Sequence, residues 1–188
     1  MIGVVLAGGS SSRFAGSPKG LIKLAGRPMA LRVADILSQV CTEVMIEASP
    51  AAGYEALGLP LLRAPVAHSG KGPLAGLAAG LAAAPPGTRV AFAPCDMPLL
   101  TPKIFEMLTR ITPGAYASTA KGVEPLVAVL DAAMRETLLS ALAHDELPRT
   151  HVVLDTAGAR PVTFADPGPF ENVNTPADLE RLKFHKFA

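Results

Sequence analysis

The chain has 188 residues, of which 49% are hydrophobic and 18% are charged, and its formal net charge is +1. This length and composition predict a single domain over residues 1–188 with a substantial core, and they argue against intrinsic disorder. The near-neutral charge, the absence of Trp and the lack of a basic run or a long apolar run argue against nucleic acid and membranes as partners.

The chain opens on an apolar stretch, residues 2–6, which predicts a buried β-strand. The sequence Ala-Gly-Gly-Ser-Ser-Ser comes next and carries almost no side-chain bulk, and Arg13 and Lys19 follow it. Backbone N–H groups can approach an anion closely in such a loop, and the two cations add positive charge. The segment is therefore suited to the β- and γ-phosphates of a nucleoside triphosphate. A tight glycine turn followed by a surface lysine is the alternative.

Helical and extended segments alternate over the following part of the chain. The apolar spacing predicts helices at residues 28–40, 73–84 and 102–111, and strands at residues 43–47, 59–63 and 90–93. This alternation is typical of a mostly parallel sheet with helices on both faces. We therefore expect an α/β fold of three layers, α/β/α, with a Rossmann-like arrangement.

One acidic residue, Asp96, closely follows the strand expected at residues 90–93. A carboxylate that emerges from a buried strand is costly unless it is paired or bound to a metal. Ligands of open α/β sheets bind at the carboxyl ends of the strands, and Mg²⁺ is held there by one or two carboxylates together with substrate phosphates. Asp96 is therefore the candidate Mg²⁺ ligand, and a turn cap before Pro98 is the alternative.

The second half of the chain has a less regular pattern. Strands are expected at residues 115–119, 125–130 and 161–164, and helices at residues 132–144 and 176–187. Thr175 is placed to cap the last helix, with Asp178 near the positive helix end.

The cysteine content bears on the cellular compartment. Cys41 and Cys95 are the only cysteines, and no secretory signal or zinc-site spacing is recognisable. We therefore expect reduced thiols in a cytoplasmic protein.

Two further segments are candidates for contact with a nucleotide. The small residues from Gly72 to Gly76 allow the close approach of a ring or a ribose, although helix–sheet packing explains them equally well. Asn172 and Asn174 share one face if their segment is extended, and they could contact phosphate or metal. Two turn-forming asparagines ahead of the last helix are the alternative.

Four segments of the chain match a known set of motifs in the same order. Residues 6–19 fit L-A-G-G-x-x-x-R-x-x-G-x-x-K, with Arg13, Gly16 and Lys19 at the last three fixed positions. Residues 72–76 fit G-P-L-A-G, residues 95–98 fit C-D-x-P, and residues 172–176 fit N-V-N-T-P. In this combination and over nearly the whole chain, the sequence resembles the molybdenum cofactor guanylyltransferase (MobA) family.

The resemblance implies a nucleotidyltransferase fold, Mg²⁺ as cofactor, and transfer of GMP from GTP to the terminal phosphate of molybdopterin. It implies catalytic roles for Arg13, Lys19 and Asp96, with Asp96 as the metal ligand. It also implies handover contacts with molybdoenzymes or their chaperones. The residues expected to contact the nucleotide or its metal are Leu6, Ala7, Gly8, Gly9, Lys19, Gly72, Gly76, Asp96, Asn172 and Asn174.

The chain departs from the family pattern at three places. Pro18 stands where the family often has an aspartate before the loop lysine, and Glu47 stands where it often has an asparagine. Pro65 falls near the place of an aspartate that contacts GTP. These departures concern recognition of guanine and ribose and leave the transfer chemistry intact.

The expected chemistry is in-line attack of a phosphate monoester on the α-phosphorus of the triphosphate. The nucleophile is already ionised near neutral pH, so no general base is needed, which agrees with the lack of a catalytic histidine motif. Lys121, Arg149 and Arg160 are candidates to contact the phosphate of the pterin. One alternative is a molybdopterin cytidylyltransferase or another NTP-dependent nucleotidyltransferase; another is a catalytically silent nucleotide- or pterin-binding module.

Overall fold

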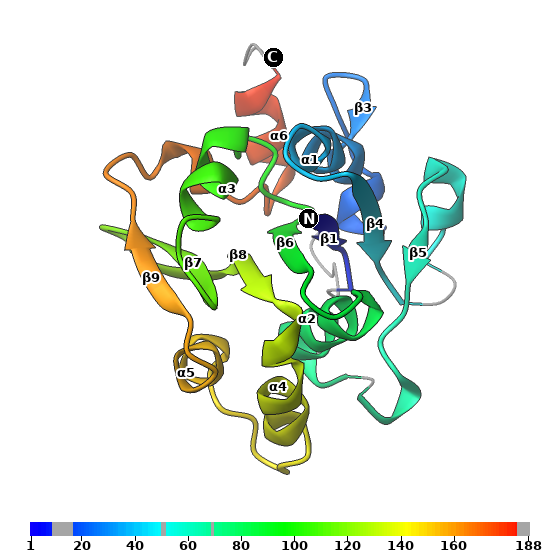
Figure 1. The fold of residues 1–188 in the computed structure, drawn as a ribbon. Helices are drawn as coiled ribbons and strands as arrows, with labels where there is room; N and C mark the ends of the chain where they lie inside the picture. The colour runs from blue at the N-terminus through cyan, green and yellow to red at the C-terminus, as the bar shows by residue number, and fades with distance from the viewer. Residues whose placement is uncertain (9–16, 50–51, 69, 184–188) are drawn as a thin grey trace.

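The computed structural model describes residues 1–8, 17–49, 52–68 and 70–183, and within them seven strands form one sheet (Figure 1). The order of the strands across the sheet is β5-β4-β1-β6-β8-β7-β9. In the described residues, β8 is the only strand of this sheet that runs against its neighbours. The strands are β1 (Ile2–Leu6), β4 (Glu43–Glu47), β5 (Leu61–Leu62), β6 (Arg89–Pro94), β7 (Gly114–Thr119), β8 (Gly122–Asp131) and β9 (Arg160–Thr163).

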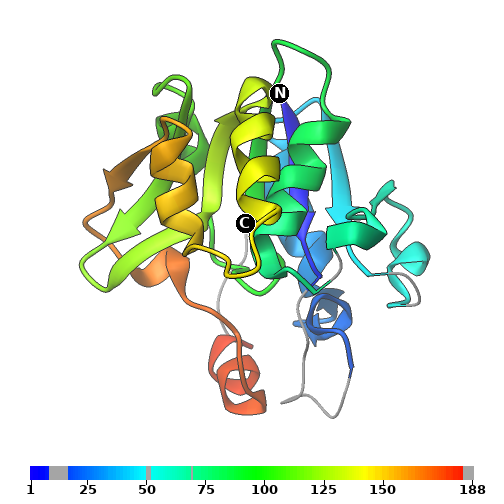
Figure 2. The same ribbon diagram turned by 90° about the horizontal axis from the view of Figure 1, so that it is seen from below.

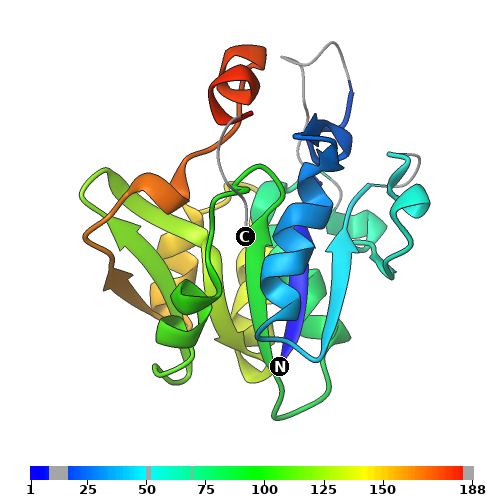
Figure 3. The same cartoon turned by 90° about the horizontal axis from the view of Figure 1, so that it is seen from above.

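Helices cover both faces of the sheet. One face carries α1 (Met29–Ser38) and α3 (Pro102–Leu108), which lie in front of the strands in Figure 3. The other face carries α2 (Gly72–Ala83), α4 (Arg135–Leu142) and α5 (Thr150–Thr156), which lie in front in Figure 2. The expected three-layer α/β/α fold with a mostly parallel sheet is therefore confirmed.

The central strands are buried on both sides, which explains their nearly continuous apolar sequence. Because side chains alternate along a strand, Val4 belongs to the core under α2 and Val5 to the core under α1. Phe92 and Ala93 of β6 divide between the same two cores. A slip of one residue between β1 and β6 would move each of these side chains into the wrong core. The register is therefore fixed, and Leu6 lies opposite Pro94.

A third, smaller core lies beyond the carboxyl edge of the sheet. It joins Leu24 and Met29 to Val173 and Leu182. Leu24 belongs to a short hairpin of β2 (Lys23–Leu24) and β3 (Arg27–Pro28), and Leu182 ends α6 (Pro176–Leu182). In Figure 3 the blue segment 17–28 and the red α6 both stand above this edge. The small core therefore holds an early and a late segment of the chain side by side, directly over the strand ends.

Most of the expected elements are present, and the differences have identifiable causes. The predicted helix at residues 132–144 is a short 3₁₀ turn, η5 (Ala132–Met134), followed by α4. Helix α5 was not predicted, because its Thr and Val residues have low helix propensity, and burial of Val153 and Leu154 decides its structure instead. The hairpin was not predicted either, because its turn has Ala25 at φ 47° and Gly26 at φ 80° rather than the usual Asn-Gly pair.

Within the described residues, α6 ends at Leu182, and the remainder of the helix expected at residues 176–187 falls partly on residues 184–188, outside them. The other 3₁₀ turns are η2 (Lys19–Leu21), η3 (Tyr54–Leu57), η4 (Val66–His68) and η6 (Gly168–Phe170). None of the helices in the described residues has the length and apolar character that a transmembrane span requires.

Candidate active site

Lys19 lies at the centre of a polar cluster at the carboxyl edge of the sheet. Its Nζ donates hydrogen bonds to Asp96 Oδ2 at 2.7 Å and to Asn174 Oδ1 at 2.5 Å. The side chains of Lys19 and Asp96 are 20% and 18% exposed, so the ion pair is partly shielded from water. Residues that the sequence analysis selected from three separate segments thus meet around one ammonium group.

The position of Asp96 is fixed by the strands next to it. The N–H group of Cys95 donates to the carbonyl of Leu6 at 3.0 Å, which extends the pairing of β6 with β1 by one residue. Asp96 therefore leaves the sheet beside the end of β1, where the loop that leads to Lys19 begins. The carbonyl of Asp96 accepts from the N–H of Val173 at 2.8 Å, so the same residue anchors the segment that carries Asn174.

Asn174 is held by the cap of α6. The N–H groups of Asn174 and Thr175 donate to Asp178 Oδ2 at 2.9 and 2.8 Å, and the N–H of Asp178 donates to Thr175 Oγ1 at 3.2 Å. The donation from Asn174 is the main reason that the pKa of Asp178 lies below its usual value. The predicted cap at Thr175 is confirmed as a reciprocal capping box. Asn172, in contrast, is exposed and does not join the Lys19 cluster among the described residues.

A buried carboxylate, Glu47, lies between the two glycine segments. It ends β4, is 8% exposed, and accepts a hydrogen bond from the N–H of Gly8. A Cβ atom placed on Gly8 or on Gly76 would lie 2.9 Å from Glu47 Oε2 in either case. The Glu47 carboxylate therefore fills the space beside both glycines, and the loop after β1 and the first half of α2 meet at it.

Burial raises the pKa of Glu47, and the hydrogen bond from Gly8 only partly offsets this effect. The sequence had marked Glu47 as a departure from the family pattern. Its burial and its contact with both glycines could not be read from the sequence, because they depend on how β4 and α2 pack.

The oxygens around Lys19 suit a magnesium ion. Asp96 Oδ2 and Asn174 Oδ1 converge on the same ammonium group, so two hard oxygen donors already face a single cation. Mg²⁺ in phosphate-transferring sites takes one or two carboxylates and completes its shell with water and phosphate oxygens. The described residues contain no group of three His, Cys, Asp or Glu side chains suited to an all-protein metal site. The donor set therefore fits Mg²⁺ bound together with a phosphate ligand.

One further acidic residue belongs to this region and was missed in the sequence. Burial raises the pKa of Glu124 on β8, and the negative charge of Asp96 raises it further. Because β8 runs antiparallel to β6, its first residues lie at the carboxyl edge of the sheet. Nothing in the sequence around Glu124 marked it, because the proximity arises only from the strand order.

The remaining expected residues are distributed as follows. Leu6 and Ala7 are buried at the end of β1, and Gly72 begins α2 with a positive φ of 66°. Gly9 and Arg13 lie outside the described residues.

The three basic residues considered for the pterin phosphate do not share one place in the fold. Lys121 lies in the turn between β7 and β8, at the same edge of the sheet as Asp96. Arg149 immediately precedes α5. Arg160 pairs with Ala115 at the amino end of β7, so it lies at the opposite edge.

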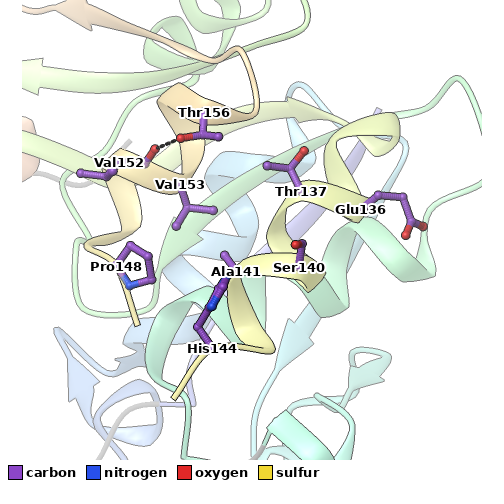
Figure 4. A pocket seen from close by; sticks show the side chains of 9 residues that line it. All are labelled: Glu136, Thr137, Ser140, Ala141, His144, Pro148, Val152, Val153 and Thr156. Atoms are coloured by element: carbon purple, nitrogen blue, oxygen red, sulfur yellow. Dashed lines mark hydrogen bonds between the residues drawn. The ribbon is translucent and has the colours of Figure 1, made fainter. Parts of the chain in front are cut away.

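A groove of about 490 Å³ lies elsewhere, between α4 and α5 (Figure 4). It is lined by Thr137, Ser140, His144, Val152, Val153 and Thr156, among others. None of the described residues that the sequence analysis selected for the nucleotide lines it. The groove therefore does not belong to the Lys19 cluster.

Comparison with known proteins places the chain among nucleotidyltransferases. Residues 3–158 match the family model of the MobA-like NTP transferase domain. Proteins named molybdenum cofactor guanylyltransferase from Yersinia pseudotuberculosis (serotype O:1b, strain IP 31758) and Yersinia pestis are each 34% identical over 183 residues, covering 95% of this chain and 92% of theirs. The crystal structure of molybdopterin-guanine dinucleotide biosynthesis protein A from Archaeoglobus fulgidus superposes with a TM-score of 0.78 at 22% identity, covering 97% of both chains.

The burial of Glu47 predicts a pH-dependent cost in stability. Its pKa in the folded protein lies above the ordinary value of 4.5, so the unfolded chain loses the proton first as the pH rises. The resulting destabilisation begins near pH 4.5 and is complete once the pH exceeds the folded pKa. When thermal unfolding is measured from pH 4.5 to 8, we expect the melting temperature of Glu47→Gln to rise relative to the wild type, by about 2–6 °C at pH 8.

Glu43→Gln provides a matched control, because Glu43 is exposed at the start of the same strand. It should follow the wild type at every pH. A difference between Glu47→Gln and the wild type that does not change with pH would contradict the argument.

Proposed function

This chain belongs to the MobA-like NTP transferase family, and from that premise we propose that it transfers GMP from GTP to the terminal phosphate of molybdopterin. Pyrophosphate is released, and the product is the guanine dinucleotide form of the cofactor. The names of the relatives that are 34% identical over 183 residues support this reaction. The observation that carries it in this chain is the convergence of Lys19, Asp96 and Asn174 beside the loop that follows β1.

The proposal treats residues 1–188 as one nucleotidyltransferase domain. The family model ends at residue 158, but the later segment contributes Asn174 to the site. Its contacts with Asp96 and Lys19, and the small core shared by Val173 and Leu24, support its inclusion in the same unit.

The positive groups of the site are assigned to the triphosphate. The Lys19 ammonium, freed from Asp96 and Asn174, binds the phosphates and neutralises charge on the leaving pyrophosphate. The loop after β1 is assigned to the same oxygens through its backbone N–H groups once those of Ala7 and Gly8, which donate to Glu47 in this structure, are released, and Arg13 adds a guanidinium. The low side-chain bulk of this loop supports the assignment, since it lets the backbone approach an anion.

The acidic and amide oxygens are assigned to the metal. Asp96 and Asn174 would hold Mg²⁺ once the ammonium no longer bridges them. When bound, the ion supplies positive charge at the α-phosphate and helps to orient the attack.

The reaction itself needs positioning more than proton transfer. An ionised oxygen of the terminal pterin phosphate forms a bond to the α-phosphorus, and the bond from that phosphorus to the bridging oxygen of pyrophosphate breaks in line. The electron pair leaves with pyrophosphate, so no proton has to move. Lys19 and Asp96 therefore act by holding charge and geometry, and the site requires no histidine.

Recognition of guanine is assigned to Glu47. The guanine edge presents two adjacent donors, the N1–H and the 2-amino group, and one carboxylate accepts from both. Cytosine and adenine each present a donor next to an acceptor, which a carboxylate repels. The position of Glu47 between Gly8 and Gly76 supports this role, because it places the carboxylate where the loop after β1 meets α2. Gly72 and Gly76 would then lie on the base and ribose side.

We expect handover contacts with molybdoenzymes or their chaperones, and a cytoplasmic location.

Substitution of the central ion pair tests the catalytic assignment. We expect Asp96→Ala to lower kcat for pyrophosphate release by about 10³ or more, since the metal loses its carboxylate. Lys19→Ala should lower kcat/KM for GTP by about 10²–10³. The control is Asp35→Ala, which breaks an exposed ion pair of the same 2.7 Å length with Arg27. Near-normal turnover in folded Asp96→Ala would remove Asp96 from the site.

Ligand-induced stabilisation tests the assignment of the base. A ligand that binds only the native state raises the melting temperature more when it binds more tightly. With Mg²⁺ and each nucleoside triphosphate at matched concentration, GTP should therefore raise it most, because Glu47 is assigned to guanine. Inosine triphosphate lacks the 2-amino group, so we expect it to bind about 10–100 times more weakly than GTP. In Glu47→Gln, the difference in affinity between GTP and inosine triphosphate should largely disappear.

Other outcomes would select the alternatives. A larger effect of CTP favours a cytidylyltransferase. Binding of a triphosphate without pyrophosphate release, in the presence of molybdopterin, favours a silent binding module.

A further inference from the structure

Tyr54 lies beneath the turn that carries Lys19. It begins η3, and it is 1% exposed. Its hydroxyl accepts a hydrogen bond from the N–H of Gly20, the residue after Lys19, at 3.1 Å. The first N–H groups of a helical turn have no partner within the turn, and Pro18, which precedes η2, provides no side-chain cap. The Tyr54 hydroxyl therefore provides the acceptor that the Gly20 N–H lacks within the turn.

The same hydroxyl reaches the segment that carries Asp96. Tyr54 belongs to the same buried core as Cys95, the residue before Asp96, and burial together with the Cys95 side chain raises the pKa of Tyr54. Burial raises the pKa of the Cys95 thiol to about 12, so the sulfur stays neutral. One phenol thus bonds to the neighbour of Lys19 and shares a core with the neighbour of Asp96.

The close packing around Gly20 leaves little freedom in this arrangement. A Cβ on Gly20 would lie 2.7 Å from Tyr54 Oη, 2.8 Å from Tyr54 Cε1 and 3.0 Å from Ala30 Cβ. The turn therefore packs directly against the tyrosine ring, and the ring limits how closely the turn can approach the core. Because Lys19 Nζ contacts Asp96 at 2.7 Å, a displacement of the turn would be felt at the ion pair.

We propose that Tyr54 is a positioning residue of this site, which holds the backbone of Lys19 in register with the backbone of Asp96 through its hydroxyl. The inference rests on the proposed function, because it assigns the purpose of the alignment to binding of the triphosphate and its metal. Tyr54 itself touches neither substrate nor metal in this account. Tyr54 affects GTP binding only by positioning Lys19. Removal of the Lys19 ammonium should therefore abolish the effect of Tyr54 on GTP binding.

Tyr116 offers a matched control for loss of a buried phenol hydroxyl. It is 2% exposed, and its hydroxyl donates to Asp155 Oδ1 at 2.8 Å. Asp155 lies on α5, away from the Lys19 cluster. Tyr54→Phe and Tyr116→Phe therefore each remove one hydroxyl hydrogen bond from a buried ring, but only the first lies next to the ion pair.

The test is a double-mutant cycle on the dissociation constant of GTP with Mg²⁺, measured by calorimetry. Tyr54→Phe should weaken binding about fivefold to tenfold in the wild-type background and less than about twofold in the Lys19→Ala background. Tyr116→Phe should change the constant by less than about twofold in both. Equal effects of Tyr54→Phe in the two backgrounds, or equal effects of the two tyrosine variants, would overturn the inference.

Two measurements keep the test decisive. Melting temperatures show whether Tyr54→Phe folds as well as Tyr116→Phe; if it does not, the cycle is measured at a temperature at which both variants are fully folded. A wild-type protein that binds none of the nucleoside triphosphates contradicts the proposed function itself. A wild-type protein that binds GTP, with Tyr54→Phe unaltered, contradicts only the role of Tyr54.

Discussion

The arrangement of the candidate site depends on one ion pair, in which the Lys19 ammonium holds Asp96 and Asn174 together. The net contribution of such a pair to folding is small, because partial removal of two charges from water offsets much of their attraction. The apolar cores on the two faces of the sheet stabilise the fold, and the small core of Leu24 and Val173 brings the segments together. The pair instead places a cation between two oxygens, where a metal and a phosphate can replace it.

A second constraint, the burial of Glu47, connects specificity with a loss of stability. A carboxylate between two glycine segments is costly to ionise, and its single described hydrogen bond comes from the N–H of Gly8. The same desolvation that raises its pKa would strengthen hydrogen bonds from a bound base. Residues that are unfavourable for folding and suited to a ligand are typical of functional sites. Glu47, which departs from the family pattern, is thus the residue that we propose recognises guanine.

The sequence predicted the parts of this structure that depend on local pattern. Strand β1 was predicted with its observed bounds. Lys19 was selected as a cation at the end of the small-residue loop, Asp96 as a carboxylate after a buried strand, and Asn174 as an amide in an extended segment. Asn172 was selected with Asn174, yet among the described residues only Asn174 joins the cluster, and Asn172 is exposed. Tyr54 and Glu124 could not be selected, because their proximity to the site results from the packing of elements distant in the sequence.

The central claim is that the triphosphate and its metal replace Lys19 between Asp96 and Asn174. Its most direct test is anomalous diffraction from crystals grown with Mn²⁺ and a GTP analogue that cannot be cleaved between the α- and β-phosphates. We expect a manganese peak about 2.1 Å from an Asp96 oxygen, with the Lys19 ammonium on the phosphates. A metal and triphosphate bound away from Asp96, for example in the groove between α4 and α5, would contradict it.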